Sequence, residues 1–331
     1  MEYDSGAKIA IPFQANKNEI CKINFNRIAL ILGNWQICLI FVKIYSMYWS
    51  NYHSHCTFCD GRSSMEDFVT FAIAKNVRKY GFSSHAPLPF LTKWTMLEDD
   101  FADYQSEFER LKLKYENKIQ LYFALEVDYI DNCSSVQNDF FRDKTFDYLI
   151  GSIHYLDQLP ENVFWTIDGD FSEFNKGLNV LFGGDIRLAI KRFYEVTESM
   201  VRVGGFEIVG HFDKICMHAS RYKSFNPADK WYQSLVGETL QLIKERGMML
   251  EINTKSMTEK GMTYPCRQFY PLIKDLQIPI MVNSDCHYPT NVIDGFRQTY
   301  QDMKRAGFKT MHQLVAGEWQ AVEFKENGLL V

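Results

Sequence analysis

From residue 47 onward, short apolar runs alternate with longer amphipathic segments. The runs have the length of buried strands, and the segments between them carry apolar residues at three- and four-residue steps, as helices do. One such helix is predicted from Phe101, Tyr104, Phe108, Leu111 and Tyr115. Strands are predicted near residues 48–54, 81–84, 119–125, 146–153, 206–210, 248–253 and 278–284. Repeated strand–helix alternation predicts an α/β fold with a parallel sheet and right-handed crossovers.

Local signals refine two segments of this pattern. Ser63 and Glu66 predict a capping box at the start of a helix that runs to about Tyr80. The stretch Asp157–Gly184 combines proline, glycine and several aromatic residues, which predicts a long loop. A loop of this length inside a compact domain is often functional, for example as a lid.

The first 46 residues do not follow the alternation. Residues 28–45 are mostly apolar, but Asn34 and Gln36 interrupt them, so the run is marginal for a membrane-spanning helix of about 20 residues. No small-residue cleavage site follows it. Three interpretations remain open: a membrane anchor, a dispensable extension, or upstream sequence translated from a misassigned start. We favour the last interpretation, which leaves residues 47–331 as a single barrel-sized domain.

Composition limits the classes of protein that fit. The chain of 331 residues is 46% hydrophobic and 23% charged, as expected of a folded globular protein. Its net charge of −5 argues against broad binding to a nucleic-acid backbone, which needs a basic face. The eight cysteines lack the spacing of a disulfide framework and no secretion signal is present, which indicates reduced thiols in the cytoplasm.

Candidate metal ligands follow the predicted strands. His53 and His55 lie two residues apart, so on a strand both imidazoles face the same side, and Asp60 follows beside Gly61. Alone, such a pair is also typical of surface histidines near a turn. Further candidates end other predicted strands: His85, Glu126, His154, His211, Asp285 and His287. In a closed barrel these strand ends converge on one face, where barrel active sites lie. Mixed imidazole and carboxylate ligands suit zinc, manganese or iron.

Six short runs resemble, in order and spacing, the motif series of the PHP family (polymerase and histidinol phosphatase). They are HSH…CDG, GFSSHAP, LEVDY, GSIHYL, VGHFDK and NSDCH, and they span about residues 47–290. The resemblance implies a distorted seven-stranded (β/α) barrel that holds two or three divalent metal ions. The ligands it implies are His53, His55, Asp60, His85, Glu126, His154, His211, Asp285 and His287. Ser84 departs from the acidic residue that many members carry before the second-motif histidine, and the position of Asp60 varies within the family.

The run GFSSHAPLP and the insert after GSIHYL are most similar to the monofunctional histidinol-phosphatase branch. This implies metal-dependent hydrolysis of L-histidinol phosphate to L-histidinol and phosphate, a cytoplasmic step of histidine biosynthesis. The expected partner is a small phosphomonoester, without nucleic acid or membrane, and the oligomeric state stays open. Two alternatives remain: a phosphoesterase acting on nucleotides or nucleic-acid ends, and a non-catalytic metal-binding barrel.

Catalysis by such a site would use Glu126, a carboxylate that can bridge two metals, together with Asp285. His53, His55, Glu126 and Asp285 are expected to hold one metal, and the other ligands one or two more. Phosphoryl oxygens also need cations, for which Arg187, Lys214 and Arg221 are candidates. Each of these has a surface-charge alternative. His218 could assist proton transfer to the leaving group, but a surface position is expected for it.

Overall fold

The computed structural model describes residues 20–21, 28–33, 36–41, 47–160 and 162–330. The chain divides into two units, Met1–Ser46 with Val331, and Met47–Leu330. In the first unit, β1 (Ile20–Cys21), β2 (Ile28–Gly33) and β3 (Gln36–Phe41) form an antiparallel sheet. The described part of the apolar run is therefore extended. Within the described ranges, the chain has no helix whose length and apolar character would let it span a bilayer.

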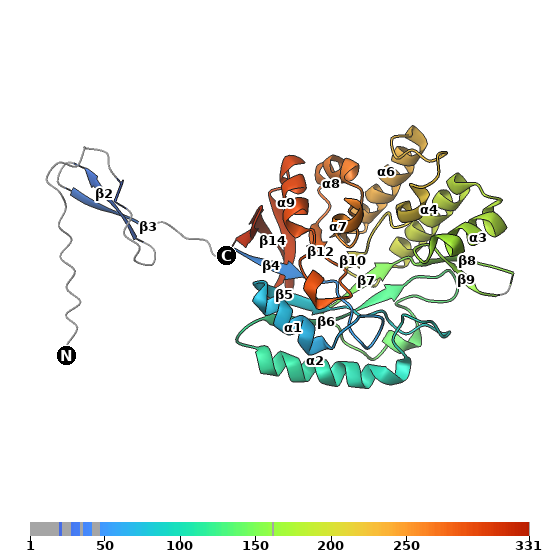
Figure 1. The fold of residues 1–331 in the computed structure, drawn as a ribbon, viewed down its shortest axis with the longest axis horizontal. Coiled ribbons are helices and arrows are strands. Elements are labelled where there is room, and N and C mark those ends of the chain that lie inside the picture. Colours follow the sequence, from blue (N-terminus) through green and yellow to red (C-terminus); the bar gives the residue numbers. More distant parts are fainter. Residues whose placement is uncertain (1–19, 22–27, 34–35, 42–46, 161, 331) are drawn as a thin grey trace. The chain divides into compact units, whose positions relative to one another are not determined.

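The second unit is built around a sheet of parallel strands that curls into a barrel (Figure 1). Its parallel strands, in spatial order, are β4 (Met47–Asn51), β5 (Val77–Phe82), β6 (Gln120–Asp128), β7 (Tyr148–Ser152), β10 (Ile208–Val209), β11 (Met249–Asn253) and β12 (Ile280–Asn283). These are the seven predicted strands. A parallel bridge between Ser54 and Cys286, just past β4 and β12, brings the first and last strands together. The α/β barrel fold is thus confirmed.

The sheet also has an antiparallel part that the sequence pattern did not predict. It consists of β13 (Thr310–Val315), β14 (Glu318–Lys325) and β15 (Gly328–Leu330), and β15 pairs antiparallel with β4. Most positions of β14 are exposed, so this strand lacks the apolar run that marks the parallel strands. The described sheet therefore has ten strands instead of seven.

Helices connect the strands and cover the outside of the barrel (Figure 1). They are α1 (Met65–Ala74), α2 (Phe101–Tyr115), α3 (Phe171–Phe182), α4 (Ile186–Val203), α5 (Cys216–Ala219), α6 (Lys230–Glu245), α7 (Met257–Lys260), α8 (Tyr270–Asp275) and α9 (Phe296–Arg305). Short 3₁₀ turns lie at Glu98–Asp100, Asp139–Phe141, Arg267–Phe269 and Pro289–Asn291. The predicted stripe of α2 is buried, as expected for an amphipathic helix on a sheet.

The first helix begins one residue later and ends earlier than predicted. Its capping box pairs Ser64 with Asp67, not Ser63 with Glu66, and the helix ends at Ala74. The residues that follow form β5, which pairs between β4 and β6. Strand pairing inside the barrel therefore overrides the helical pattern between Val77 and Tyr80.

The prediction of a long loop over Asp157–Gly184 is wrong. This segment contains the end of β8 (Tyr155–Gln158), β9 (Phe164–Thr166) and α3. The buried ring of Trp165 fixes the arrangement, because it packs on Phe174 at 5.0 Å and against Gly177. A Cβ on Gly177 would come within 2.0 Å of the indole, so only glycine allows this contact. The insert is a packed hairpin and helix.

Aromatic and aliphatic side chains fill the barrel interior on the β13–β14 side. The ring of Tyr52 lies 5.7 Å from Tyr148 and 5.1 Å from Trp319. The hydroxyl of Tyr52 accepts a hydrogen bond from the Leu314 amide at 3.0 Å. Packing and this hydrogen bond together attach the C-terminal strands to the barrel.

Replacing Trp319 by alanine is expected to lower the free energy of unfolding by about 2 kcal/mol, because a half-buried ring loses its contacts and leaves a gap. Urea denaturation followed by circular dichroism measures this loss. Leu113→Ala, at a side chain 73% exposed, is the control and should cost less than about 0.5 kcal/mol. Equal midpoints for Trp319→Ala and the parent protein would show that the C-terminal strands do not support the barrel.

We further propose that residues 47–331 form an independently folding domain. A protein that starts at Met47 should keep the circular-dichroism spectrum of the full chain and the hydrolytic activity expected from its sequence, because the sheet and core described above lie within Met47–Leu330. Loss of either property on truncation would contradict this boundary.

Candidate metal centre

The alternation of side chains along the strands builds the floor of the site. On β6, Ala124 and Glu126 point to the same side of the sheet, as do Met249 and Glu251 on β11. Ala124 and Met249 belong to the apolar interior cluster, and the carboxylates two residues later follow it towards the strand ends. A polar layer therefore lies directly above an apolar one.

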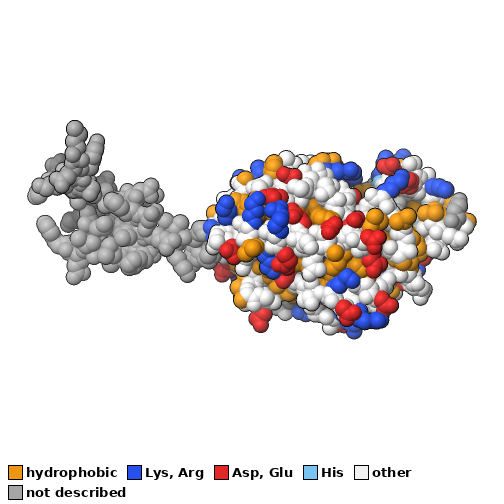
Figure 2. All heavy atoms as spheres, turned by 90° about the horizontal axis from the view of Figure 1, so that it is seen from below, with side chains coloured by type: hydrophobic (Ala, Val, Ile, Leu, Met, Phe, Trp, Pro, Cys, Tyr) orange, Lys and Arg blue, Asp and Glu red, His pale blue; other side chains and the backbone are white. Residues whose placement is uncertain are grey.

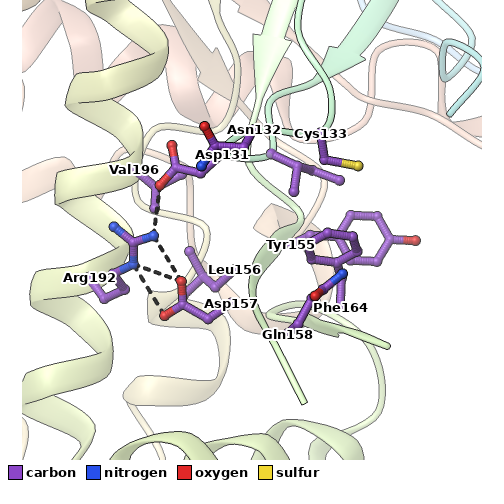
Figure 3. Close-up of a pocket in the computed structure, with 11 residues that line it drawn as sticks. Asp131, Asn132, Cys133, Tyr155, Leu156, Asp157, Gln158, Phe164, Arg192 and Val196 are labelled. Carbon is purple, nitrogen blue, oxygen red and sulfur yellow. Dashed lines mark hydrogen bonds and ion pairs between the residues drawn. The ribbon is translucent and has the colours of Figure 1, made fainter. Parts of the chain in front are cut away.

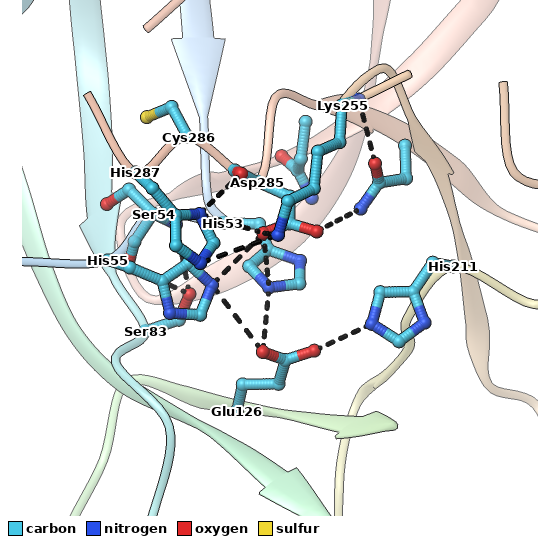
Figure 4. Close-up of polar contacts among 12 residues, drawn as sticks. His53, Ser54, His55, Ser83, Glu126, His211, Lys255, Asp285, Cys286 and His287 are labelled. Carbon is cyan, nitrogen blue, oxygen red and sulfur yellow. Dashed lines mark hydrogen bonds and ion pairs between the residues drawn. The ribbon is translucent and has the colours of Figure 1, made fainter. Parts of the chain in front are cut away.

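The predicted ligands come together above this layer. Figure 4 shows His53, His55, Glu126, His211, Asp285 and His287 among them. Their donor atoms form three overlapping groups in which all atoms lie within 4.8 Å of one another. The first group is His53, His55 and Asp285; the second is His85, Glu126 and His154; the third is His55, Asp60, His85 and His287. His211 joins the second group, because its Nε2 lies 2.9 Å from Glu126 Oε1.

Glu126 links the groups through its two oxygens. Oε2 lies 3.2 Å from His53 Nε2 and 3.5 Å from His55 Nε2. Oε1 lies 2.9 Å from His211 Nε2 and 3.7 Å from His154 Nε2. Oε2 also lies 3.1 Å from His85 Nδ1, so each oxygen faces a different set of histidines and the carboxylate would be able to bridge two metal ions.

Asp285 and Asp60 extend the cluster on the side of His287. Asp285 Oδ1 lies 3.1 Å from His55 Nε2, and Asp60 Oδ1 lies 3.1 Å from His287 Nε2. Asp285 has a φ of 48°, a conformation rarely adopted by residues other than glycine and asparagine. Asp60 is brought back to His55 by a turn that ends at Gly61, where a Cβ would meet the backbone of Cys56 at 2.4 Å.

The residues present fit divalent metal ions. Buried atoms of five of them have no hydrogen-bond partner within the described part of the chain: His53 Nε2, His55 Nε2, His85 Nδ1, Asp60 Oδ1 and Glu126 Oε2. Leaving one such atom unsatisfied costs about 1–3 kcal/mol, and an ion is one of the few explanations for several together. Imidazole and carboxylate donors of this kind suit zinc, manganese or iron.

Two buried carboxylates orient the histidines. Glu251 Oε1 lies 2.7 Å from His53 Nδ1, and Asp128 Oδ1 lies 2.7 Å from His154 Nδ1. The other Glu251 oxygen accepts the backbone amide of His211 at 2.9 Å. Such contacts fix the tautomer of a ligand histidine and leave Nε2 free for a metal.

Charge keeps the carboxylates of the cluster ionised. Burial alone would raise the pKa of Glu126, but His53, His85 and His154 outweigh it and hold the pKa well below its usual range. The same balance lowers the pKa of Asp285, where Lys255 and His53 oppose burial. Both groups are therefore anionic, as metal ligands must be.

The candidate phosphate-binding cations lie in different environments. Lys214 is buried, and its Nζ lies 3.4 Å from Asp168 Oδ2, while the same oxygen lies 3.9 Å from His154 Nε2. Arg187 is exposed and stacks on Trp231 at 4.6 Å. Arg221 is exposed and stacks on Phe171 at 3.6 Å. Of the three, Lys214 is the one whose ion pair lies beside the histidines of the cluster.

The expectation of a surface position for His218 is wrong. The residue is 6% exposed, and its Nε2 lies 2.7 Å from the carbonyl oxygen of Gly169. This contact attaches the segment that carries Asp168 to α5, the helix that begins two residues after Lys214. The rings of Phe171 and Phe174 cover it, which the sequence spacing gave no means to predict.

Four residues of the site were missed by sequence reasoning: Asp128, Asp168, Glu251 and Lys255. Asp128 and Glu251 follow inward-facing strand positions, so the two-residue period would have found them. Lys255 follows β11 by two residues, and its Nζ lies 3.1 Å from Asp285 Oδ1. Asp168 comes from the insert that was taken for a loop, and no local signal marks it.

A separate cavity of about 490 Å³ opens between the β8–β9 hairpin and α4 (Figure 3). None of its lining residues is a metal-donor residue named above. Arg192 lies at its edge, but Asp157 and Asp131 accept its N–H groups at 2.9 and 2.7 Å. Because these carboxylates neutralise the guanidinium, the cavity offers no free cation of its own for a phosphate.

The surface shown in Figure 2 carries basic and acidic side chains interspersed over the same face. This pattern agrees with the small net negative charge of the chain. The cluster of histidines and carboxylates inside the barrel mouth is therefore the candidate functional site.

Fold and site together define a metal-dependent phosphoesterase barrel, and the family model of the PHP domain matches residues 51–255. The chain belongs to the PHP family. A probable histidinol-phosphatase of Schizosaccharomyces pombe is 24% identical to it over 80% of this chain and 89% of the relative. One of Deinococcus radiodurans is 21% identical over 78% of this chain and 94% of the relative.

A solved structure supports the same fold. The histidinol phosphate phosphatase of Lactococcus lactis, in complex with zinc, L-histidinol and phosphate, superposes with a TM-score of 0.65. The match covers 83% of this chain and 100% of that chain at 20% identity. The family resemblance of the sequence motifs is thereby confirmed.

Glu251→Gln is expected to weaken zinc binding by about 10- to 100-fold, because the amide cannot hold His53 and the His211 amide as the carboxylate does. Competition with a chromophoric chelator measures the affinity. Glu207→Gln is the matched control, since Glu207 also accepts a backbone amide, that of Leu149, at the other end of the strands. Unchanged zinc affinity in Glu251→Gln would refute the orienting role.

Proposed function

We propose that this protein hydrolyses L-histidinol phosphate to L-histidinol and phosphate, as a cytoplasmic metal-dependent enzyme of histidine biosynthesis. The observation that carries the proposal is Glu126, whose two oxygens face two different sets of histidines. Membership of the PHP family and the histidinol-phosphatase relatives, which cover most of the chain, support the choice of substrate.

The donor groups suggest how two or three metal ions would be held. His53, His55 and Asp285, with one oxygen of Glu126, would hold the first. His154, His211 and the other oxygen of Glu126 would hold the second. Asp60 and His287 would belong to a third. His85 lies between these groups, with Nδ1 3.1 Å from Glu126 Oε2 and Nε2 3.9 Å from Asp60 Oδ1. Such ions, when bound, supply an activated water and neutralise charge on phosphoryl oxygens.

The chain's own residues would bind and orient the substrate. The buried ammonium of Lys214, beside His154 and Asp168, would contact a phosphoryl oxygen and stabilise its negative charge. Glu251 and Asp128 would keep the histidine rings from rotating during the reaction. Near-complete burial of Glu126 and both histidines of the HxH pair would exclude bulk water beneath the phosphate.

A phosphoesterase acting on nucleic-acid ends is the second candidate function within this family. The net charge of −5 and the interspersed charges of Figure 2 favour a small substrate instead. A non-catalytic barrel would be expected to have lost donor residues, whereas every predicted ligand lies in the cluster.

Glu126→Ala is the sharpest test of the mechanism. We expect kcat for L-histidinol phosphate to fall about 10³-fold or more, since one side chain serves two donor groups. Phosphate release from the manganese- or zinc-loaded protein is the measurement. Glu207→Ala removes a carboxylate that lies just before β10, at the opposite end of the strands from the site. This variant should retain the activity of the parent protein.

Full activity in Glu126→Ala would overturn the mechanism. Activity should also vanish on dialysis against a chelator and return with added manganese or zinc. Preference for oligonucleotide ends over L-histidinol phosphate in the same assay would overturn the substrate and leave the metal centre standing.

A further inference from the structure

Lys255 reaches across the mouth of the cluster from the loop after β11 (Figure 4). Its Nζ lies 3.1 Å from Asp285 Oδ1 and 3.4 Å from His287 Nε2. Its backbone is fixed, because the amide donates to Asn253 Oδ1 at 2.9 Å. The side chain is 38% exposed, so the ammonium lies where the cluster meets solvent.

The two acceptors of this ammonium belong to different donor groups. Asp285 is part of the first group and His287 of the third. A neutral imidazole has one acceptor nitrogen, so His287 Nε2 cannot accept from Lys255 and bind a metal at the same time. A metal on Asp285 would in addition repel the ammonium at short range. Metal binding therefore requires Nζ to leave its present position.

We propose that Lys255 is a phosphate-binding cation whose release is coupled to metal binding. This inference rests on the proposed phosphatase function and assigns Lys255 as a residue that would bind the phosphate. The lysine stem is long and flexible, and its backbone stays anchored, so the displaced ammonium remains at the mouth of the site. A phosphoryl group that enters there is the anion it would meet.

Lys214 cannot exchange partners in the way proposed for Lys255. It is 2% exposed, its Nζ is paired with Asp168, and it lies over the ring of Tyr264 at 5.4 Å. A buried and paired ammonium contributes a fixed positive charge. Lys255, half-exposed and bonded to donor atoms, is the cation that exchanges partners.

The proposal predicts two effects of opposite sign for Lys255→Met. Zinc affinity should rise about three- to tenfold, because no ammonium competes for Asp285 and His287. Affinity of the zinc-loaded protein for inorganic phosphate should fall about tenfold, the scale of one charge-assisted hydrogen bond. KM for the phosphomonoester should rise with little change in kcat.

The experiment uses the full chain, stripped with a chelator and then titrated with zinc against a chromophoric competitor. Inorganic phosphate is titrated into the zinc-loaded protein by calorimetry. Lys260→Met, at an exposed lysine of α7 in the same segment, is the matched control and should change neither affinity. Lys255→Arg keeps the charge and should retain most of the phosphate affinity.

Unchanged or weaker zinc binding in Lys255→Met would overturn the coupling, and unchanged phosphate affinity would overturn the assigned contact. A loss of phosphate affinity in Lys260→Met as large as in Lys255→Met would also overturn it, since the effect would then be general surface charge. Neither titration uses L-histidinol phosphate. The outcome is therefore independent of whether that ester or another phosphomonoester is the substrate.

Discussion

The structure depends on one buried carboxylate between two sets of imidazoles. Glu126 is 1% exposed, in a barrel whose next layer is apolar. An ionised carboxylate at such depth is stable only with cationic partners, because desolvation of a lone charge costs several kcal/mol. The histidines that face its two oxygens come from the ends of β4, β5, β7 and β10, so strands distant in sequence must converge on this one group. Closing the barrel is what brings those partners within reach.

The surrounding polar layer holds the histidines in a fixed geometry. Glu251 contacts both His53 and the His211 amide, and it also accepts from Asn253 and Asn283 at 2.9 and 3.0 Å. Buried carboxylates and amides such as these would destabilise the barrel if they had no hydrogen-bond partners. They are satisfied by one another, whereas several donor atoms above them are not. The hydrogen-bonded residues therefore form the framework of the site, and the unpaired nitrogen and oxygen atoms above them are the candidate metal-binding atoms.

Periodicity explains how much of this could be predicted from the sequence. Most of the parallel strands are buried on both faces, and their ends carry histidines and carboxylates, so both the barrel and most of the ligands follow from position along the strands. The C-terminal strands were missed because β14 is largely exposed and has no apolar run. The insert after His154 was missed because Trp165, Phe174 and Gly177 fold it through contacts that its composition, with one proline and four glycines, does not indicate.

The cations of the site were the least predictable part, and their origin shows why. Apart from Asp60, the metal donors lie on strands or within four residues of their ends, where a shift of one residue along the strand would turn each strand side chain to the other face. Lys214 and Lys255 instead come from the loops after β10 and β11, and Asp168 from the insert. Loops carry no such period, so a lysine there looks like any surface charge. Its role follows only from the atoms it contacts: a buried carboxylate for Lys214, and two metal-donor atoms for Lys255. The barrel thus fixes where an ion would bind, and the loops determine which anion can approach it.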